Sequence, residues 1–146
     1  MERPDVRVLG LDYGRVRIGL ALSDPRGVIA IPLEVYRRGS LEEDLRKMKN
    51  IIEEHRIRRI VVGLPLNMNG SEGPQALETR GFVEVLQGAL DCPIEMWDER
   101  LTSRIAERAM LEGDLSRAKR KKHRDKIAAC VMLQGYLDRM KLGGDQ

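Results

Sequence analysis

Three carboxylates in separate parts of the chain could together bind a divalent metal ion. Asp12 ends one strand-like segment, Glu99 follows the end of another, and Asp125 lies in the first turn of a helical segment. Carboxylate oxygens are the ligands that Mg²⁺ and Mn²⁺ prefer in proteins. If the three side chains meet, they predict an all-oxygen site for hard cations.

Asp125 is the most informative of the three acids. Its helical neighbours Ala128, Ala129 and Met132, which follow at three, four and seven residues, predict a stripe that faces a sheet. A carboxylate on that face is costly to bury unless a positive charge neutralises it. The dipole of the helix contributes typically less than about 1 kcal/mol, so a metal ion is the stronger explanation.

Each of the other two acids also has a simpler explanation. Asp12 precedes Tyr13 and Gly14, and aspartate is a common turn residue. Asp98 and Glu99 precede a helix start, where acidic side chains often cap the helix or meet its dipole. Whether Asp98 assists Glu99 stays open from the sequence. The metal site therefore depends on convergence of the three acids and not on any one of them.

Cationic side chains adjoin all three acids. A basic run, Arg117 to Arg124, ends next to Asp125, and we predict that it is a loop that binds phosphates. The alternative is a solvated, mobile run without a partner. Aromatic residues do not interleave with these cations, so recognition of a nucleic-acid backbone is favoured over base stacking. The residues predicted to contact nucleic acid are Arg15, Arg17, Arg100, Lys119, Arg120, Lys121, Lys122, Arg124 and Lys126.

The hydrophobic pattern predicts the elements that position these residues. Three strands joined by short turns must form an antiparallel meander, and Pro32 favours an edge position for the third. Ser40 to Glu43 is a capping-box signature, after which helices and strands alternate. The expected strands are 6–12, 18–23, 28–36, 59–64 and 94–98, and the expected helices are 41–52, 75–90, 102–113 and 123–140. This order predicts an α/β fold with a five-stranded mixed sheet and helices on both faces.

Length and composition favour a soluble protein with one domain over residues 1–146. The 146 residues carry a net charge of only +3 with both signs mixed. No apolar run is long enough to span a bilayer, and the N-terminal residues lack the apolar stretch of a secretory signal. Cys92 and Cys130 form neither a disulfide framework nor a metal-ligand pattern, so we expect packed, reduced thiols. These features predict a cytoplasmic protein without a membrane partner.

Several segments resemble motifs of the bacterial YqgF/RuvX family, in the family order and over almost the whole chain. Ser103 is a departure, because a second threonine is commoner there, and both residues carry a hydroxyl. The matching segments are Val8–Gly14, Arg17–Asp24, Gly63–Ser71, Asp98–Ser103, Asp125–Ala129, Leu133–Gln134 and Tyr136–Leu137.

The resemblance implies a ribonuclease H-like fold, related to Holliday-junction resolvases. It also implies a nuclease that processes the 5′ end of precursor 16S rRNA, with Asp12, Glu99 and Asp125 as catalytic metal ligands. Our working hypothesis is hydrolysis with two Mg²⁺ or Mn²⁺ ions. One ion, bridged by Asp12, activates a water, and the other stabilises the leaving oxygen.

Other functions remain open from the sequence. The chain could cut branched DNA as a Holliday-junction resolvase, or bind nucleic acid without catalysis in transcription or ribosome assembly. A nucleotide phosphotransferase of the sugar-kinase type is disfavoured. Enzymes of that class need two α/β domains around a cleft, and the predicted elements make up one. Precursor rRNA and branched DNA are both candidate partners. The protein could be a monomer or a homodimer, although a resolvase would need a symmetric dimer to make paired cuts.

Overall fold

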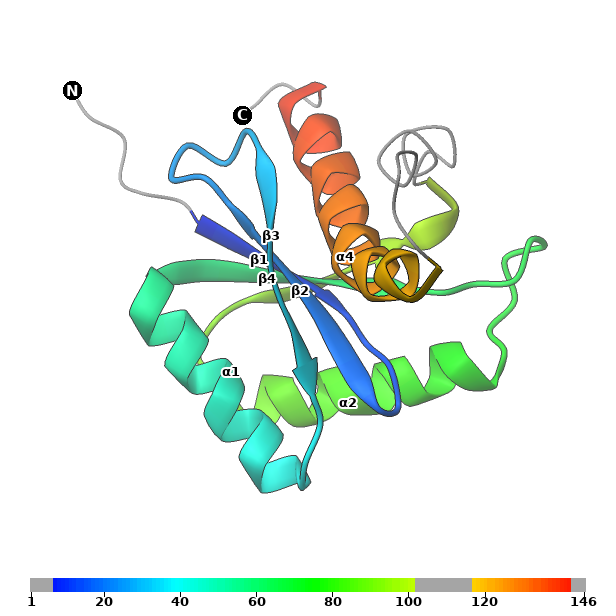
Figure 1. Ribbon diagram of the computed structural model, residues 1–146, viewed down its shortest axis with the longest axis horizontal. Coiled ribbons are helices and arrows are strands. Elements are labelled where there is room, and N and C mark those ends of the chain that lie inside the picture. The colour runs from blue at the N-terminus through cyan, green and yellow to red at the C-terminus, as the bar shows by residue number, and fades with distance from the viewer. Residues whose placement is uncertain (1–6, 102–116, 143–146) are drawn as a thin grey trace.

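A computed structural model describes residues 7–101 and 117–142, with side chains at 7–101 and 127–140. Its centre is a five-stranded sheet in the order β3-β2-β1-β4-β5 (Figure 1). β1 pairs antiparallel with β2 and parallel with β4, β2 pairs antiparallel with β3, and β4 pairs parallel with β5. The mixed sheet predicted from the sequence is therefore confirmed. The strands are β1 (Arg7–Asp12), β2 (Arg17–Ser23), β3 (Ala30–Arg37), β4 (Ile57–Leu64) and β5 (Ile94–Asp98).

The positions of the strands in the sheet follow from their sequences. β3 is an edge strand, as Pro32 predicts, and the β2–β3 register shifts beside the residue that pairs with this proline. β4 lies inside the sheet, and its residues Val61 and Val62 are both fully buried. A strand covered on both faces needs such a continuous apolar run.

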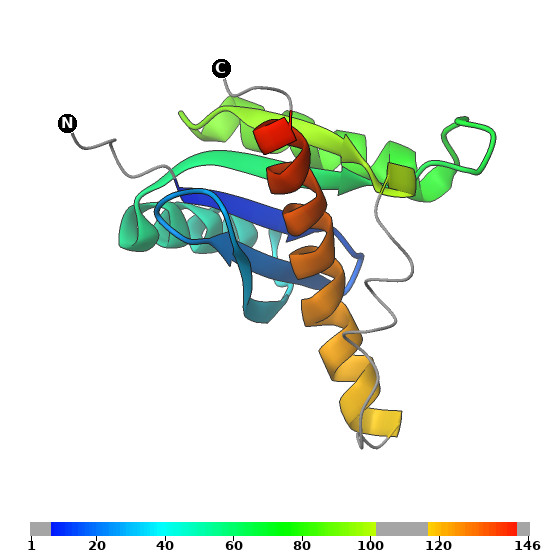
Figure 2. The same cartoon turned by 90° about the horizontal axis from the view of Figure 1, so that it is seen from above.

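Helices cover both faces of the sheet, as predicted. α1 (Leu41–His55) and α2 (Pro74–Ala89) pack on one face, and α4 (Arg117–Leu142) crosses the other (Figure 2). A short 3₁₀ turn, η1 (Glu99–Leu101), directly follows β5. The first face contributes Leu9, Leu11, Ile18, Met48, Ile60, Phe82 and Leu86 to the core, and the α4 face contributes Val8, Ala21, Val61, Trp97, Ala129 and Leu133.

The start of α1 has the capping box that the sequence predicts. The Ser40 hydroxyl accepts from the backbone N–H of Glu43 at 3.1 Å, and the Glu43 carboxylate accepts from the backbone N–H of Ser40 at 2.8 Å. These two bonds satisfy backbone donors that the first helical turn otherwise leaves without partners. α2 begins at Pro74, one residue before the predicted start, because a proline fits the first turn of a helix.

α4 begins earlier than the sequence analysis predicts. The helix starts at Arg117 and not at His123, so the basic run is helical and the expectation of a loop is wrong. Arginine, lysine and alanine are good helix formers, and a helix extends more easily than it nucleates. The expected stripe is confirmed in the buried half, where Ala129 and Met132 are buried and Ala128 is half-buried. The helix expected over 102–113 lies outside the described residues.

The two thiols are packed, as predicted. Cys130 is buried and Cys92 is half-buried, both are free, and burial raises the pKa of each. The Cys130 thiol donates to the carbonyl oxygen of Ala30 at 3.3 Å, which joins α4 to the edge strand β3. In the part of the chain that the structure describes, no helix is both long and apolar enough to cross a bilayer.

Candidate active site

Asp12 lies on the face of the sheet that α4 covers. It is the last residue of β1 and pairs with Gly19 of β2. Side chains alternate along a strand, so Asp12 shares a face with Gly10. A Cβ built on Gly10 would lie 2.8 Å from Cβ of Leu133 and 3.4 Å from the carbonyl oxygen of Ala129, both in α4. The face on which Asp12 was predicted to lie is therefore covered by a helix, as expected.

The Glu99 carboxylate lies beside Asp12 on this same face. A Cβ built on Gly63 would lie 2.5 Å from Oε2 of Glu99, so the carboxylate occupies the space above this glycine. Gly63 follows Val62, which pairs with Leu11, and therefore it neighbours Asp12 across the β1–β4 pair. The two acids occupy one face at the carboxyl ends of adjacent parallel strands, the usual position of ligand sites in such sheets.

The third predicted acid, Asp125, lies one turn before Ala129 in the continuous helix α4. Ala129 packs over Gly10, two residues before Asp12. The Asp125 side chain lies outside the described ones, and among those described no three metal-ligating side chains gather. The convergence of all three acids therefore stays a prediction.

Asp98 supports the turn that carries Glu99. Its Oδ1 accepts from the backbone N–H of Arg100 at 2.9 Å, and its Oδ2 accepts from Nη2 of Arg100 at 2.7 Å. The hydrogen bonds from Arg100 hold the pKa of the Asp98 carboxyl below its usual value. These bonds bracket Glu99 between two residues that are joined to each other.

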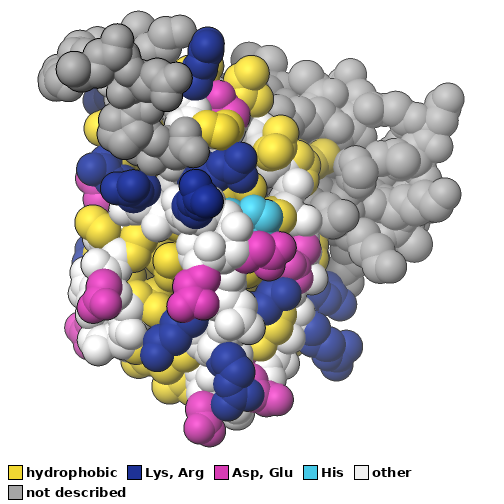
Figure 3. Space-filling model, turned by 90° about the vertical axis from the view of Figure 1, so that its left-hand side faces the viewer, with side chains coloured by type: hydrophobic (Ala, Val, Ile, Leu, Met, Phe, Trp, Pro, Cys, Tyr) yellow, Lys and Arg dark blue, Asp and Glu magenta, His cyan; other side chains and the backbone are white. Residues whose placement is uncertain are grey.

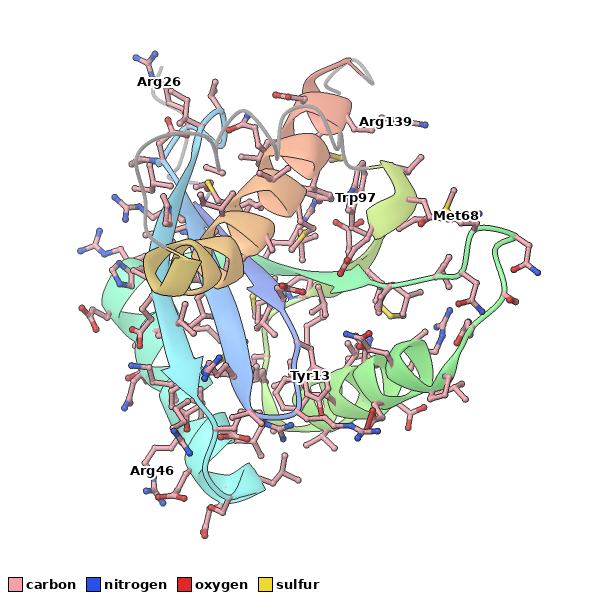
Figure 4. All side chains as sticks on the ribbon, turned by 45° about the vertical axis from the view of Figure 1, so that its right-hand side comes forward. Tyr13, Arg26, Arg46, Met68, Trp97 and Arg139 are labelled. Atoms are coloured by element: carbon pink, nitrogen blue, oxygen red, sulfur yellow. The ribbon has the colours of Figure 1, made fainter. Side chains whose placement is uncertain are left out.

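Arg100 also ties this turn to the loop that follows β4. Its Nη1 donates to the carbonyl oxygen of Met68 at 3.2 Å, and Figure 4 shows Met68 beside η1. The loop is cross-linked internally, since the N–H of Asn67 donates to the carbonyl of Ser71 at 2.9 Å. Gly70 adopts a positive φ of 89°, which favours glycine. We expected Arg100 to contact nucleic acid, and here its guanidinium joins two segments of the site.

The other arginines next to Asp12 differ in their surroundings. Nε of Arg15 donates to both carboxylate oxygens of Glu78, at 2.8 and 3.0 Å, and this bond raises the pKa of Arg15. Arg17 is exposed and lines an open pocket of about 270 Å³ next to Asp12. The predicted contacts Lys119, Arg120, Lys121, Lys122, Arg124 and Lys126 lie in α4, and their side chains are outside the described ones. The remaining residues that line the pocket are Tyr13, Gly14, Val16, Gly19 and Gln75.

The side of the molecule that includes α1 has a different charge pattern. Figure 3 shows Lys and Arg side chains interspersed with Asp and Glu side chains there. Interspersed charges give little sustained attraction for a polyanion. The grouped cations of the chain are instead those of α4, the helix on the face of Asp12.

The sequence analysis missed two residues that shape the site. Gly63 leaves the space that Glu99 occupies, and Arg38 bonds to the turn after Asp12. Gly63 lies within the motif Gly63–Ser71, so a signal was present in the sequence. Arg38 carries no such signal, because its partner Tyr13 is 25 residues away.

Comparisons with known proteins identify the family. The model of the family described as "RuvX: Holliday junction resolvase" matches residues 6–139. A protein from Syntrophomonas wolfei named "Putative pre-16S rRNA nuclease" is 51% identical over 96% of this chain and 99% of its own length. A protein of the same name from Symbiobacterium thermophilum is 53% identical over 91% of this chain and 92% of its own.

Solved structures agree on the fold. RuvC of T. thermophilus in complex with a Holliday junction substrate superposes with a TM-score of 0.61 at 14% identity, covering 93% of this chain and 96% of RuvC. T. thermophilus RuvC in a second structure gives a TM-score of 0.55 at 16% identity, covering 93% and 97%. The predicted ribonuclease H-like fold is confirmed. Because the family model spans nearly all of the chain and the relatives share about half of its residues, this protein belongs to the RuvX family.

Proposed function

We propose that this protein is a metal-dependent nuclease that hydrolyses phosphodiester bonds and processes the 5′ end of precursor 16S rRNA. The observation that carries the proposal is the Glu99 carboxylate above Gly63, next to Asp12 on the same face of the sheet. The names of the half-identical relatives support RNA as the substrate.

The residues at the strand ends fit hard divalent cations. The donors are carboxylate oxygens, and Gly63 leaves open the space above the sheet in which Glu99 lies. Asp12, Glu99 and Asp125 would hold two Mg²⁺ or Mn²⁺ ions. When bound, such ions supply an activated water and stabilise charge on a leaving oxygen.

The chain itself would bind and orient the substrate. Arg17 lines the pocket next to Asp12, where its guanidinium can hold a phosphate of the bound strand. The basic run at the start of α4, the helix that covers the face of Asp12, would attract the backbone without reading its sequence. Asp98 and Arg100 would keep Glu99 in place during catalysis.

Cleavage of a labelled RNA that carries the precursor 5′ extension tests the proposal. We expect cleavage only with Mg²⁺ or Mn²⁺, and loss of cleavage in Asp12→Asn and Glu99→Gln with the fold intact by circular dichroism. Lys49→Gln serves as the control, because Lys49 on α1 lies next to the starts of β4 and β5 and not next to their carboxyl ends. Purified Asp12→Asn with full activity would contradict the proposal.

A Holliday-junction resolvase is the second candidate, because the family description names this activity and the fold is that of RuvC. A four-way DNA junction in the same assay separates the two substrates. Symmetric paired cuts in the junction, together with a dimeric state measured by sedimentation, would favour the resolvase. Salt-sensitive binding without cleavage of either substrate would favour a binding protein.

A further inference from the structure

A half-buried arginine, Arg38, lies next to the turn that follows Asp12. The Arg38 side chain is 18% exposed and pairs with Asp44, which is fully buried. Nε of Arg38 donates to Oδ2 of Asp44 at 2.9 Å. Oδ1 of Asp44 accepts from the Tyr36 hydroxyl at 2.9 Å and from the backbone N–H of Gly39 at 3.0 Å. Asp44 is therefore held by three donors, and it holds the guanidinium in one orientation.

The other side of the guanidinium contacts the turn itself. Nη1 of Arg38 donates to the Tyr13 hydroxyl at 2.7 Å and to the carbonyl oxygen of Gly14 at 3.4 Å. The backbone N–H of Arg38 donates to the carbonyl oxygen of Val16 at 2.8 Å. The accepting residues are the first, second and fourth after Asp12, so Arg38 holds almost the whole turn that ends β1.

Two aromatic rings fix the same arginine from the side of α2. Its guanidinium carbon lies 4.9 Å from the ring centre of Tyr13 and 5.3 Å from that of Phe82. The two rings are 4.8 Å apart, and Figure 4 shows Tyr13 between the sheet and α2. Burial lowers the pKa of Arg38, but the bonds to Asp44 and Tyr13 raise it more, so the guanidinium stays charged.

Stability alone does not explain a buried ion pair, because apolar side chains of similar size often stabilise a core equally well or better. The contacts of Arg38 with the turn need a planar group with several donors, and lysine does not supply one. We propose that Arg38 is a positioning residue that orients the Asp12 carboxylate through the turn of residues 13–16. The inference rests on the proposed function, since it gives Asp12 the task of binding a metal ion.

Mn²⁺ affinity tests the proposal, measured by calorimetry on the whole chain together with stability in urea. Arg38→Lys should weaken Mn²⁺ binding and lower kcat by about 10- to 100-fold, the range typical for groups that orient metal ligands, with little change in KM. Tyr13→Phe keeps the ring and removes one acceptor, so its effect should have the same direction and a smaller size.

Arg59→Lys is the matched control. Arg59 donates to the Tyr136 hydroxyl at 2.8 Å and pairs with Glu95 at 3.2 Å, at the opposite ends of β4 and β5. We expect this variant to lose stability while its Mn²⁺ affinity and kcat stay unchanged. If Arg38→Lys and Arg59→Lys lose equal stability and both keep Mn²⁺ affinity, the proposal is overturned.

Two further variants make the outcome decisive. Should Arg38→Lys fail to fold, unchanged Mn²⁺ affinity in Tyr13→Phe overturns the proposal. Asp12→Asn separates this inference from the proposed function. If Asp12→Asn binds Mn²⁺ as the wild type does, both the proposed function and the positioning role of Arg38 are wrong. If Asp12→Asn binds Mn²⁺ more weakly but Arg38→Lys and Tyr13→Phe bind it normally, only the positioning role of Arg38 is wrong.

Discussion

Two glycines of the sheet, Gly10 and Gly63, leave space on the face that α4 covers. Gly10 admits the backbone of α4, and Gly63 admits the carboxylate of Glu99. Both lie in strands, where glycine weakens pairing and lacks a side chain to pack. Their presence is explained by what approaches the sheet at each position.

Replacement of Gly63 by alanine should damage the site without unfolding the protein. The new Cβ would lie 2.5 Å from Oε2 of Glu99, so the carboxylate must leave its position above this residue. We expect Mg²⁺ or Mn²⁺ affinity to fall by about tenfold or more. Calorimetric titration with Mn²⁺ measures the effect.

Gly81→Ala is the control for this substitution. A Cβ at Gly81, in the middle of α2, meets nothing within 4 Å. This variant should keep its metal affinity and gain about 0.5–1 kcal/mol, because alanine is a better helix former than glycine. Equal metal affinity in both variants would refute the explanation given for Gly63.

The Asp98–Arg100 pair predicts how stability depends on pH. Arg100 lowers the folded-state pKa of Asp98, so the pair stabilises the protein above the unfolded-state pKa, and the contribution is lost as pH falls through the folded value. The stability difference between the wild type and Asp98→Asn should be constant near neutral pH and shrink below about pH 4. Urea unfolding at a series of pH values measures it, and a difference independent of pH would exclude the pair as its source.

The candidate site could be predicted from the sequence only in part. Asp12 and Glu99 were found because each stands at the end of a predicted strand, and the face of Asp12 followed from alternation along β1. The pair of Arg38 and Tyr13 could not be found, since residues far apart in the chain form it. Periodicity describes neighbours in one element, whereas such contacts depend on how elements pack.

At the scale of elements, α1 shows how a local signal can fix a boundary. Ser40→Ala should cost about 1 kcal/mol of stability, because it removes the bond from the hydroxyl to the N–H of Glu43. Metal affinity should not change, since the cap lies on the helix and not on the turn after Asp12. Urea unfolding and Mn²⁺ titration measure the two effects, and a loss of metal affinity would show that this cap also supports the site.

The start of α4 was mispredicted for a physical reason. The sequence analysis looked for apolar periodicity, which begins near Ile127, whereas the helix extends ten residues before it. Charged residues with good helix propensity leave no such pattern. The strands and the first two helices carry periodic or capping signals, and their boundaries were accordingly predicted to within a few residues.

At the scale of the whole molecule, the net charge is small, but many of the cations are grouped. The net charge is only +3, yet α4 begins with a run of lysines and arginines, on the face of Asp12. Figure 2 shows its first turns extending beyond the strands. A long strand of nucleic acid could contact these turns while it passes the strand ends.

The salt dependence of binding tests this arrangement. With inactive Asp12→Asn as background, Lys121→Gln should reduce the slope of log K against log salt by about 0.7 on single-stranded RNA, which is one phosphate contact. Arg26→Gln, an exposed cation in the β2–β3 turn, should leave the slope unchanged. Filter binding over a range from low to moderate salt measures the slopes. Equal slopes for the two variants would show that RNA does not contact Lys121.

The unbroken course of α4 restricts how the chain can change in length. Each residue turns a helix by about 100°, so one residue inserted after Lys126 would swing Asp125 to another side of the helix while Ala129 and Leu133 stay on Gly10. Composition, charge and core would all survive such an insertion, but the alignment that we predict between Asp125 and the other two acids would be lost. Variation in length should therefore accumulate in the connecting loops, while the interval between Asp125 and Ala129 stays fixed.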